Sequence, residues 1–211
     1  MKITSSYDLF NPPPDNEDYL YEVDQPEGIK GLTYLDDFIS VEEEKMLLDL
    51  INRQEWLGDL KRRVQHYGWR YNYKARNIDY SMFLGELPDW ALKIAERLYN
   101  NGLTTDLADQ VIINEYQPGQ GIANHVDCEP CFGDSIVSLS LGASCIMNFV
   151  NLESKEKIEA VLKPRSIVVI KGESRYKWSH GIPARLADTI DNQYIKRQLR
   201  ISMTFRKVII R

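Results

Sequence analysis

Apolar residues recur at helical spacing in two stretches of the first half of the chain. In the first stretch, Ser40 and Glu43 have the spacing of a capping box and precede an apolar stripe made of Met46, Leu47, Leu50 and Ile51. The second stretch begins at Pro88, ends at Asn100-Asn101-Gly102, and carries a stripe made of Ala91, Ile94, Ala95 and Leu98. The pattern predicts two helices, and we expect both to cover a sheet.

From Val111 onward the pattern changes to short β segments separated by glycine and proline. The predicted strands cover residues 111–116, 136–141, 144–150, 158–162, 166–171 and 199–208. Two helices followed by many short strands predict a mainly β (α+β) fold, a double-sheet jelly roll with the N-terminal helices packed on one sheet. The mouth of such a fold is a natural place for a ligand.

The N-terminal segment has a different composition. Pro12, Pro13 and Pro14 fix φ and withhold backbone donors, and residues 3–27 contain seven acidic side chains and no lysine or arginine. We therefore expect residues 1–29 to be an acidic, proline-rich, extended or disordered arm. Residues 30–211 are expected to form one domain.

Total charge, apolar runs and cysteines restrict the class of protein only loosely. The formal charge is −5, but without residues 2–27 the chain has 25 basic and 24 acidic residues, so its charge does not exclude a nucleic-acid partner. No apolar run approaches the roughly 18 residues of a membrane span, and the first residues lack the basic and continuous apolar regions of a secretory signal, so we expect none. Three cysteines do not indicate a disulfide framework. We expect an intracellular protein, cytoplasmic or nuclear, without a membrane partner; the oligomeric state is left open, with a monomer as the default.

The candidate chemistry begins with His125 and Asp127. Residues two apart on an extended segment point to one face, so an imidazole and a carboxylate can converge on one ion. A single His-x-Asp is weak evidence, but His180 supplies a second imidazole. Two histidines and one carboxylate leave coordination positions open, as in Fe(II) oxygenases. His66 lies far upstream, and we expect it to be hydrogen-bonded elsewhere in the domain.

A second group of polar residues lies near the last strand. Alternation places Arg200, Ser202, Thr204 and Arg206 on one face of that strand. If this face looks into a cavity, Arg200 can hold a dicarboxylate through two parallel hydrogen bonds. Asn114 and Tyr116 also share a face and can offer amide and phenol donors to the same ligand. An ordinary half-exposed strand and packed core residues are the alternatives.

Taken in order, these motifs resemble the catalytic core of the AlkB family over roughly residues 110–208. The set is Asn114-x-Tyr116-x-Pro118-Gly119, His125-x-Asp127, Val137-Ser-Leu-Ser-Leu-Gly142, Gly172-Glu-Ser-Arg175, His180-Gly181 and Arg200-x5-Arg206. The resemblance implies a double-stranded β-helix and an Fe(II)/2-oxoglutarate-dependent dioxygenase that uses dioxygen to oxidise a modified base in nucleic acid, either RNA, including tRNA, or single-stranded DNA.

The resemblance also implies roles for individual residues. The metal ligands are His125, Asp127 and His180, which form the catalytic group together with Arg200. The residues implied to bind 2-oxoglutarate are Asn114, Tyr116, Arg200, Ser202 and Arg206. Ser202 departs from the many family members that have asparagine there, because a hydroxyl offers one donor and an amide offers two.

The segment Lys61–Arg76 is interpreted as the nucleic-acid contact. It contains six basic side chains, four aromatic ones and no acidic one. The aromatic residues alternate as on a strand, which predicts one aromatic face with the charges on the other. Cations suit phosphates, and rings suit an unstacked base. The predicted substrate-binding residues are Arg62, Arg63, Tyr67, Trp69 and Arg70. The alternative is an edge strand whose aromatic side chains pack on the core.

Motifs upstream of the core resemble the branch of the family that hydroxylates a modified wobble uridine in tRNA. They are Glu42-Glu43-Glu44-Lys45-Met46-Leu47-Leu48, Arg62-Arg63-Val64-x-His66-Tyr67-Gly68 and Gly85-x-Leu87-Pro88-Asp89. The branch resemblance favours RNA, but it leaves the modified base and the choice between hydroxylation and demethylation open.

Other functions remain possible on the sequence alone. A protein or small-molecule hydroxylase can share the same iron core, and a jelly roll can be a non-catalytic binding module. A zinc-dependent base deaminase needs a second cysteine three positions after Cys131, where the chain has Asp134. Cys128-x-x-Cys131 resembles half a zinc site or a redox pair, but without a partner pair we expect two small apolar turn residues.

Overall fold

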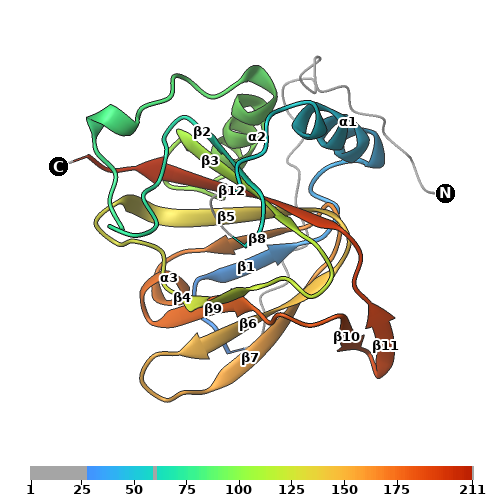
Figure 1. Cartoon of the computed structure of the whole chain (residues 1–211). Helices are drawn as coiled ribbons and strands as arrows, with labels where there is room; N and C mark the ends of the chain where they lie inside the picture. Colours follow the sequence, from blue (N-terminus) through green and yellow to red (C-terminus); the bar gives the residue numbers. More distant parts are fainter. Residues whose placement is uncertain (1–27, 59–60, 211) are drawn as a thin grey trace.

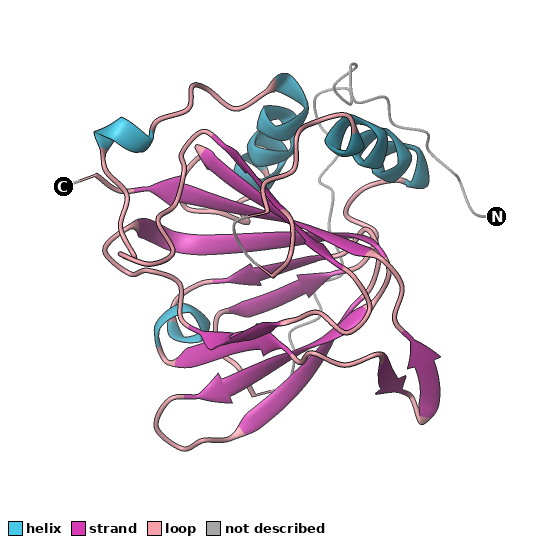
Figure 2. Cartoon of the chain, in the orientation of Figure 1, coloured by secondary structure: helices cyan, strands magenta, loops and turns pink. Residues whose placement is uncertain are grey.

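The computed structural model describes residues 28–58 and 61–210, in which two antiparallel β-sheets face each other and two longer helices cover the outer face of the larger sheet (Figures 1 and 2). The larger sheet has the strand order β1 (Leu32–Leu35), β8 (Ile167–Ile170), β5 (Phe132–Gly142), β12 (Arg200–Val208), β3 (Gln110–Tyr116), β2 (Val64–Tyr67). The smaller has the order β4 (Ile122–His125), β9 (Trp178–Ile182), β6 (Cys145–Asn151), β7 (Lys157–Leu162). The predicted jelly roll is confirmed.

A hairpin and two short helical segments complete the described elements. The hairpin consists of β10 (Ala187–Ile190) and β11 (Gln193–Lys196) and projects from the body of the molecule (Figure 1). The 3₁₀ segment η1 (Tyr80–Met82) precedes the helix α2 (Asp89–Asn100), and the single helical turn α3 (Glu173–Tyr176) leads into β9. In the described ranges no helix is long and apolar enough to cross a membrane.

The central strand β12 shows how the sequence pattern creates two faces. Ile201, Met203 and Phe205 are buried in the core between the larger sheet and the helices. Ser202 and Thr204 alternate with them and line a cavity on the opposite face, between the sheets. Because neighbouring strand residues point to opposite faces, one strand serves both the apolar core and the polar site.

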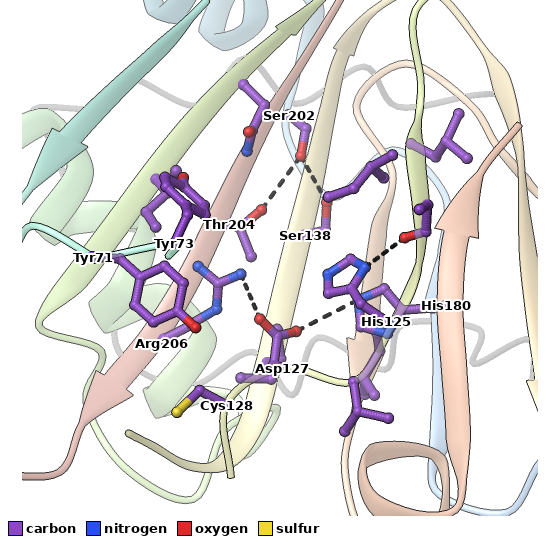
Figure 3. A pocket seen from close by; sticks show the side chains of 18 of the residues that line it. Tyr71, Tyr73, His125, Asp127, Cys128, Ser138, His180, Ser202, Thr204 and Arg206 are labelled. Carbon is purple, nitrogen blue, oxygen red and sulfur yellow. Dashed lines mark hydrogen bonds and ion pairs between the residues drawn. The ribbon is translucent and has the colours of Figure 1, made fainter. Parts of the chain in front are cut away.

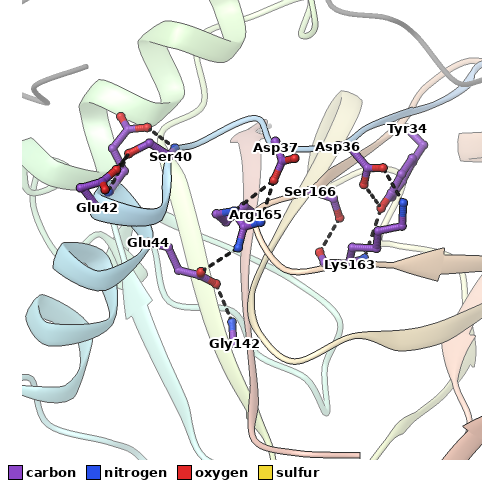
Figure 4. A network of polar contacts seen from close by, with 11 residues as sticks. Tyr34, Asp36, Asp37, Ser40, Glu42, Glu44, Gly142, Lys163, Arg165 and Ser166 are labelled. Atoms are coloured by element: carbon purple, nitrogen blue, oxygen red, sulfur yellow. Dashed lines mark hydrogen bonds and ion pairs between the residues drawn. The ribbon is translucent and has the colours of Figure 1, made fainter. Parts of the chain in front are cut away.

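The two predicted helices are confirmed as α1 (Val41–Asn52) and α2 (Asp89–Asn100). The capping box is present, since the Ser40 side chain accepts from the Glu43 amide and the Glu43 carboxylate accepts from the Ser40 amide. Glu43 also pairs with Arg97 of α2, which joins the two helices. Figure 4 shows a further tie, in which Arg165 before β8 pairs with Asp37 and Glu44 at the start of α1.

The six strands predicted after Val111 are all present, within a few residues of the expected bounds. The strands β1, β4, β9, β10 and β11 were not predicted. The predicted aromatic strand within residues 61–76 is wrong beyond Tyr67, where β2 ends and Gly68 adopts a left-handed φ of 76°. The predicted N-terminal arm lies, apart from residues 28 and 29, outside the described residues.

Candidate metal centre

Strand pairing in the smaller sheet brings together three side chains that are far apart in the sequence. His125 at the end of β4 is the direct register partner of His180 on β9, and Asp127 follows His125 by two residues. One ligand atom of each residue lies within 4.8 Å of the others, and His180 Nε2 is 3.4 Å from Asp127 Oδ2 (Figure 3). The structure therefore assembles the predicted two-histidine, one-carboxylate group.

The environment of Asp127 keeps its carboxylate charged. Burial raises its pKa, but the nearby charge of Arg206 and the imidazoles of His180 and His125 outweigh burial, so the pKa of Asp127 lies well below its usual range. Arg206 Nη2 donates to Oδ1 at 2.7 Å, whereas the buried Oδ2 has no hydrogen-bond partner among the described residues. A buried carboxylate oxygen without a donor, beside two imidazoles, suits a cation.

Each of the two imidazoles can present a ring nitrogen to a metal. Burial lowers the pKa of His180 to about 4, so its ring is neutral near pH 7. His125 Nδ1 lies 2.9 Å from the Ala123 carbonyl, which can accept only from a protonated Nδ1, so this contact leaves His125 Nε2 as the ligand atom. Neutral imidazoles and a charged carboxylate are the forms that bind a divalent ion. These residues fit Fe(II).

A cavity of about 370 Å³ contains the triad. The larger sheet contributes hydroxyls to its wall, since Ser202 Oγ lies 3.1 Å from Ser138 Oγ and 3.4 Å from Thr204 Oγ1. Asn114 and Tyr116 from β3 line the same cavity. This wall can donate to and accept from a polar ligand lying beside the triad.

Strand register also brings together the residues predicted to bind 2-oxoglutarate. Asn114 is paired with Ser202, and Tyr116 with Arg200, on β3 and β12. Arg200 does not line the large cavity itself; its guanidinium lies 5.5 Å from the centroid of the Tyr116 ring and its Nη2 donates to Ser140 Oγ. Nε and Nη1 of this buried arginine have no partner among the described residues. Unused guanidinium donors of this kind suit a carboxylate.

The predicted substrate-binding residues lie in different places. Arg62 lines the cavity, and its Nε donates to Asn114 Oδ1 at 2.8 Å. Arg63 instead makes a two-point ion pair with Glu115. Tyr67 packs edge-on against Trp90 of α2, on the helix side of the sheet.

The remaining part of this segment turns back toward the site. Trp69 packs against Phe83, and Arg70 is exposed outside the cavity lining. Tyr71 and Tyr73 line the cavity on the Arg206 side, opposite the two imidazoles (Figure 3). Arg76 also lines it. Tyr71 and Tyr73 belong to the aromatic face that the sequence predicted, but neither they nor Arg76 were among the predicted substrate-binding residues.

Two further groups near the triad were missed or misinterpreted. Cys128 and Cys131, expected to be simple turn residues, are joined in a disulfide, because the turn after Asp127 brings their side chains together. Arg175 is fully buried and donates to the main-chain carbonyl of Asp127. The sequence drew attention to Arg175 only as part of a family motif.

Comparison with known proteins gives a consistent result. A model of the 2OG-Fe(II) oxygenase superfamily matches residues 50–206. The Arabidopsis thaliana protein named alkylated DNA repair protein ALKBH8 homolog is 38% identical, over 88% of this chain and 60% of that protein. The Mus musculus protein named tRNA (carboxymethyluridine(34)-5-O)-methyltransferase ALKBH8 is 39% identical, over 84% of this chain and 30% of that protein. The chain thus spans less than two thirds of either relative.

The fold can also be compared with a solved structure. The structure of OsALKBH1 matches with a TM-score of 0.62 over 84% of this chain and 96% of that chain. Its sequence identity to this chain is 16%, so the likeness is one of fold.

Proposed function

The chain belongs to the AlkB family of the 2OG-Fe(II) oxygenase superfamily, and from this premise we propose that it oxidises a modified base in nucleic acid. It is an Fe(II)/2-oxoglutarate-dependent dioxygenase. When bound, iron and 2-oxoglutarate supply the oxidant from dioxygen, and the co-substrate leaves as succinate and carbon dioxide. His125, Asp127 and His180 would hold the iron.

The residues that would hold 2-oxoglutarate lie on β3 and β12, and all of them except Arg200 line the cavity that the triad also lines. Arg200 and Arg206 are buried or nearly so and have unused guanidinium donors, which suit the two carboxylates of this co-substrate. The neutral donors that accompany them are Asn114, Tyr116 and Ser202. Arg206 also holds Asp127, so one residue links the metal ligand to the co-substrate strand.

One observation carries the choice of a nucleobase as substrate. The cavity at the triad is lined by two tyrosines and two arginines from a single segment: Arg62, Tyr71, Tyr73 and Arg76. Aromatic rings can stack on an unpaired base, and arginines can pair with the phosphates beside it. The names of the two relatives refer to DNA repair and to a tRNA nucleotide, and we propose RNA, with tRNA as its first candidate, as the substrate.

The oxidised bond determines the product. Hydroxylation of a carbon-linked side group leaves the hydroxyl on the base, whereas hydroxylation of an N-methyl group gives a hemiaminal that releases formaldehyde. The methyltransferase activity in the mouse protein's name is not transferred to this chain, which spans 30% of that protein. A nucleic-acid substrate also implies an intracellular location, cytoplasmic or nuclear.

The test is succinate release after anaerobic reconstitution with Fe(II) and 2-oxoglutarate, with the reaction started by adding dioxygen. Substrates would be oligonucleotides with N-methylated bases, anticodon stem-loops with wobble-uridine modifications, their unmodified counterparts, and peptides. We expect modified RNA to stimulate succinate release above the level without substrate, and formaldehyde to distinguish demethylation from hydroxylation. Stimulation by peptides and by no oligonucleotide would overturn the proposal in favour of a protein hydroxylase on the same core.

A further inference from the structure

Arg175 is a buried cation whose hydrogen-bond partners are main-chain carbonyls. A buried arginine would ordinarily be expected to pair with an acidic side chain. Its exposed fraction is 2%, and no acidic side chain among the described residues forms an ion pair with it. Nη1 donates to the carbonyl of Asp127 at 3.0 Å, and Nη2 to the carbonyl of Cys128 at 3.4 Å. One guanidinium thus spans two successive main-chain carbonyls, which lie on either side of the Cys128 Cα atom.

The segment that carries Arg175 is itself anchored. The Ser174 hydroxyl donates to the Lys171 carbonyl and accepts from the Lys171 amide, while the Ser174 amide donates to the Lys30 carbonyl. These bonds attach α3 to the ends of β8 and β1 in the larger sheet. Five residues after Arg175 the chain reaches His180. Arg175 therefore connects α3, which leads to His180, with the main chain of Asp127.

We propose that Arg175 is a positioning residue, whose two-point grip on the Asp127 and Cys128 carbonyls orients the Asp127 carboxylate toward the two imidazoles. The proposal rests on the assignment of His125, Asp127 and His180 as metal ligands. A free backbone in this turn would let the carboxylate rotate away from the position where its Oδ2 atom meets His180 Nε2. Groups that orient a metal ligand without touching the metal typically affect affinity strongly.

The sign of the effect separates positioning from electrostatics. A guanidinium near the triad repels a divalent cation, so if Arg175 acted only through its charge, removing that charge would strengthen metal binding. If it acts by holding the turn, removing it weakens binding in spite of the relieved repulsion. A purely structural role would lower the stability of the fold and leave the metal affinity of the folded protein unchanged.

The experiment measures Mn(II) affinity, with Mn(II) as a redox-inert probe, by titration followed by electron paramagnetic resonance, and it needs no catalytic turnover. The proteins are wild type, Arg175→Met, Arg175→Lys, Asp127→Ala and Arg97→Met, each checked by circular dichroism and thermal unfolding. Arg97 is the matched control, because it too is an arginine that joins two segments of the chain. It donates to Glu43 and to the Phe38 carbonyl, at the helices and away from the triad.

We expect Arg175→Met to weaken Mn(II) binding by roughly 10–100-fold. Arg175→Lys should fall between Arg175→Met and wild type, because an ammonium can keep the charge but reaches the two carbonyls less well than a planar fork. Arg97→Met should lose thermal stability and keep its Mn(II) affinity.

Unchanged or tighter Mn(II) binding by folded Arg175→Met would overturn the proposal. If Arg175→Met does not fold, Arg175→Lys decides, and wild-type affinity in that variant would overturn the two-point grip. Asp127→Ala tests the assignment of the metal ligands on which the proposal rests. Wild-type Mn(II) affinity in that variant would refute this assignment, and that outcome is distinguishable from failure of the Arg175 proposal alone.

Discussion

Arg206 Nη2 donates to Asp127 Oδ1 at 2.7 Å and so joins the end of β12 to the turn that follows β4. Because Arg206 occupies Oδ1, only Oδ2 is left facing His180. The contact therefore keeps the carboxylate ionised and at the same time selects the oxygen that can reach a metal. It also connects the turn after β4, in the sheet that carries His125 and His180, to a strand that carries proposed co-substrate residues.

The first prediction concerns the metal ligands. His125→Ala and Asp127→Ala should each abolish turnover and weaken Fe(II) binding while leaving the fold largely intact, because each removes one of three protein ligands. His66→Gln is the matched control, since it changes the remaining histidine of the chain, on β2. Anaerobic Fe(II) titration and succinate assays measure both effects. Normal turnover in His125→Ala and Asp127→Ala would remove the triad from the mechanism.

A second prediction follows from the buried imidazole of His180. Burial lowers its pKa from 6.5 to about 4, so the unfolded chain takes up a proton over this pH range before the folded protein does. This contribution to the free energy of unfolding is complete above pH 6.5 and is lost as the pH falls toward 4. At 1.36 kcal/mol per pKa unit it amounts to at most about 3 kcal/mol.

Urea unfolding of the metal-free protein between pH 4.5 and 7.5 tests this dependence. The His180→Gln variant should show a flatter decline of stability toward acid than wild type. The same slope in wild type and His180→Gln would contradict the assignment of this pH dependence to His180.

The third prediction concerns Arg200. Arg200→Lys should raise the KM for 2-oxoglutarate while changing kcat much less, because lysine keeps the charge but cannot make two parallel hydrogen bonds to a carboxylate. Succinate formation at varied 2-oxoglutarate gives both constants. Arg165→Lys is a control, since Arg165 pairs with Asp37 and Glu44 outside the cavity. An unchanged KM in Arg200→Lys would place the co-substrate elsewhere.

The three residues of the triad could be predicted from the sequence, although the strands β4 and β9 that carry its histidines could not. The sequence around β4, Ile122-Ala-Asn-His125, has no clear apolar alternation, and β9 is buried at all five positions, so neither reads as a half-buried strand. The residue types and their spacing nevertheless indicated a metal site. What the sequence could not supply was the pairing of His125 with His180, because that register depends on contacts between distant segments.

The prediction of one continuous aromatic strand was wrong for a local reason. Alternation of Tyr67, Trp69, Tyr71 and Tyr73 suggested one face, but at Gly68 the main chain passes so close to Asp109 that a Cβ would lie 1.8 Å from its carbonyl oxygen. The left-handed turn there ends β2 and reverses which side later residues face. A glycine inside an apparent strand was the available signal.

A fourth prediction separates the two sides of that turn. Tyr67→Ala should lower the free energy of unfolding by roughly 2 kcal/mol, because its ring packs on Trp90 in the helix-side core. Tyr71 packs against Tyr73 and Phe132 but also lines the cavity, so Tyr71→Ala should in addition raise the KM for the nucleic-acid substrate, since stacking on one base contributes ~1–3 kcal/mol. Thermal unfolding and succinate assays on both variants compare them. Equal substrate KM in wild type and Tyr71→Ala would exclude the ring from base recognition.

The last prediction divides the basic residues of the same segment. Arg62 and Arg76 line the cavity, whereas the guanidinium of Arg63 is held by both oxygens of Glu115 and lies over the Trp56 ring. An arginine already paired with a buried carboxylate has fewer donors left for phosphate. Arg62→Ala and Arg76→Ala should therefore weaken binding to single-stranded RNA of any sequence, and Arg63→Ala should weaken it less.

Salt dependence distinguishes phosphate contacts from other causes of weak binding. Each lost phosphate contact should reduce the slope of log affinity against log salt by about 0.7 for a single strand. Fluorescence anisotropy of a labelled oligonucleotide across a salt series measures this slope, with circular dichroism to check folding. Arg63→Ala serves as the matched charge-removal control, because it lowers the net charge by the same amount. If all three variants lose the same slope, the segment acts only through total charge, and the cavity-lining arginines make no specific phosphate contact.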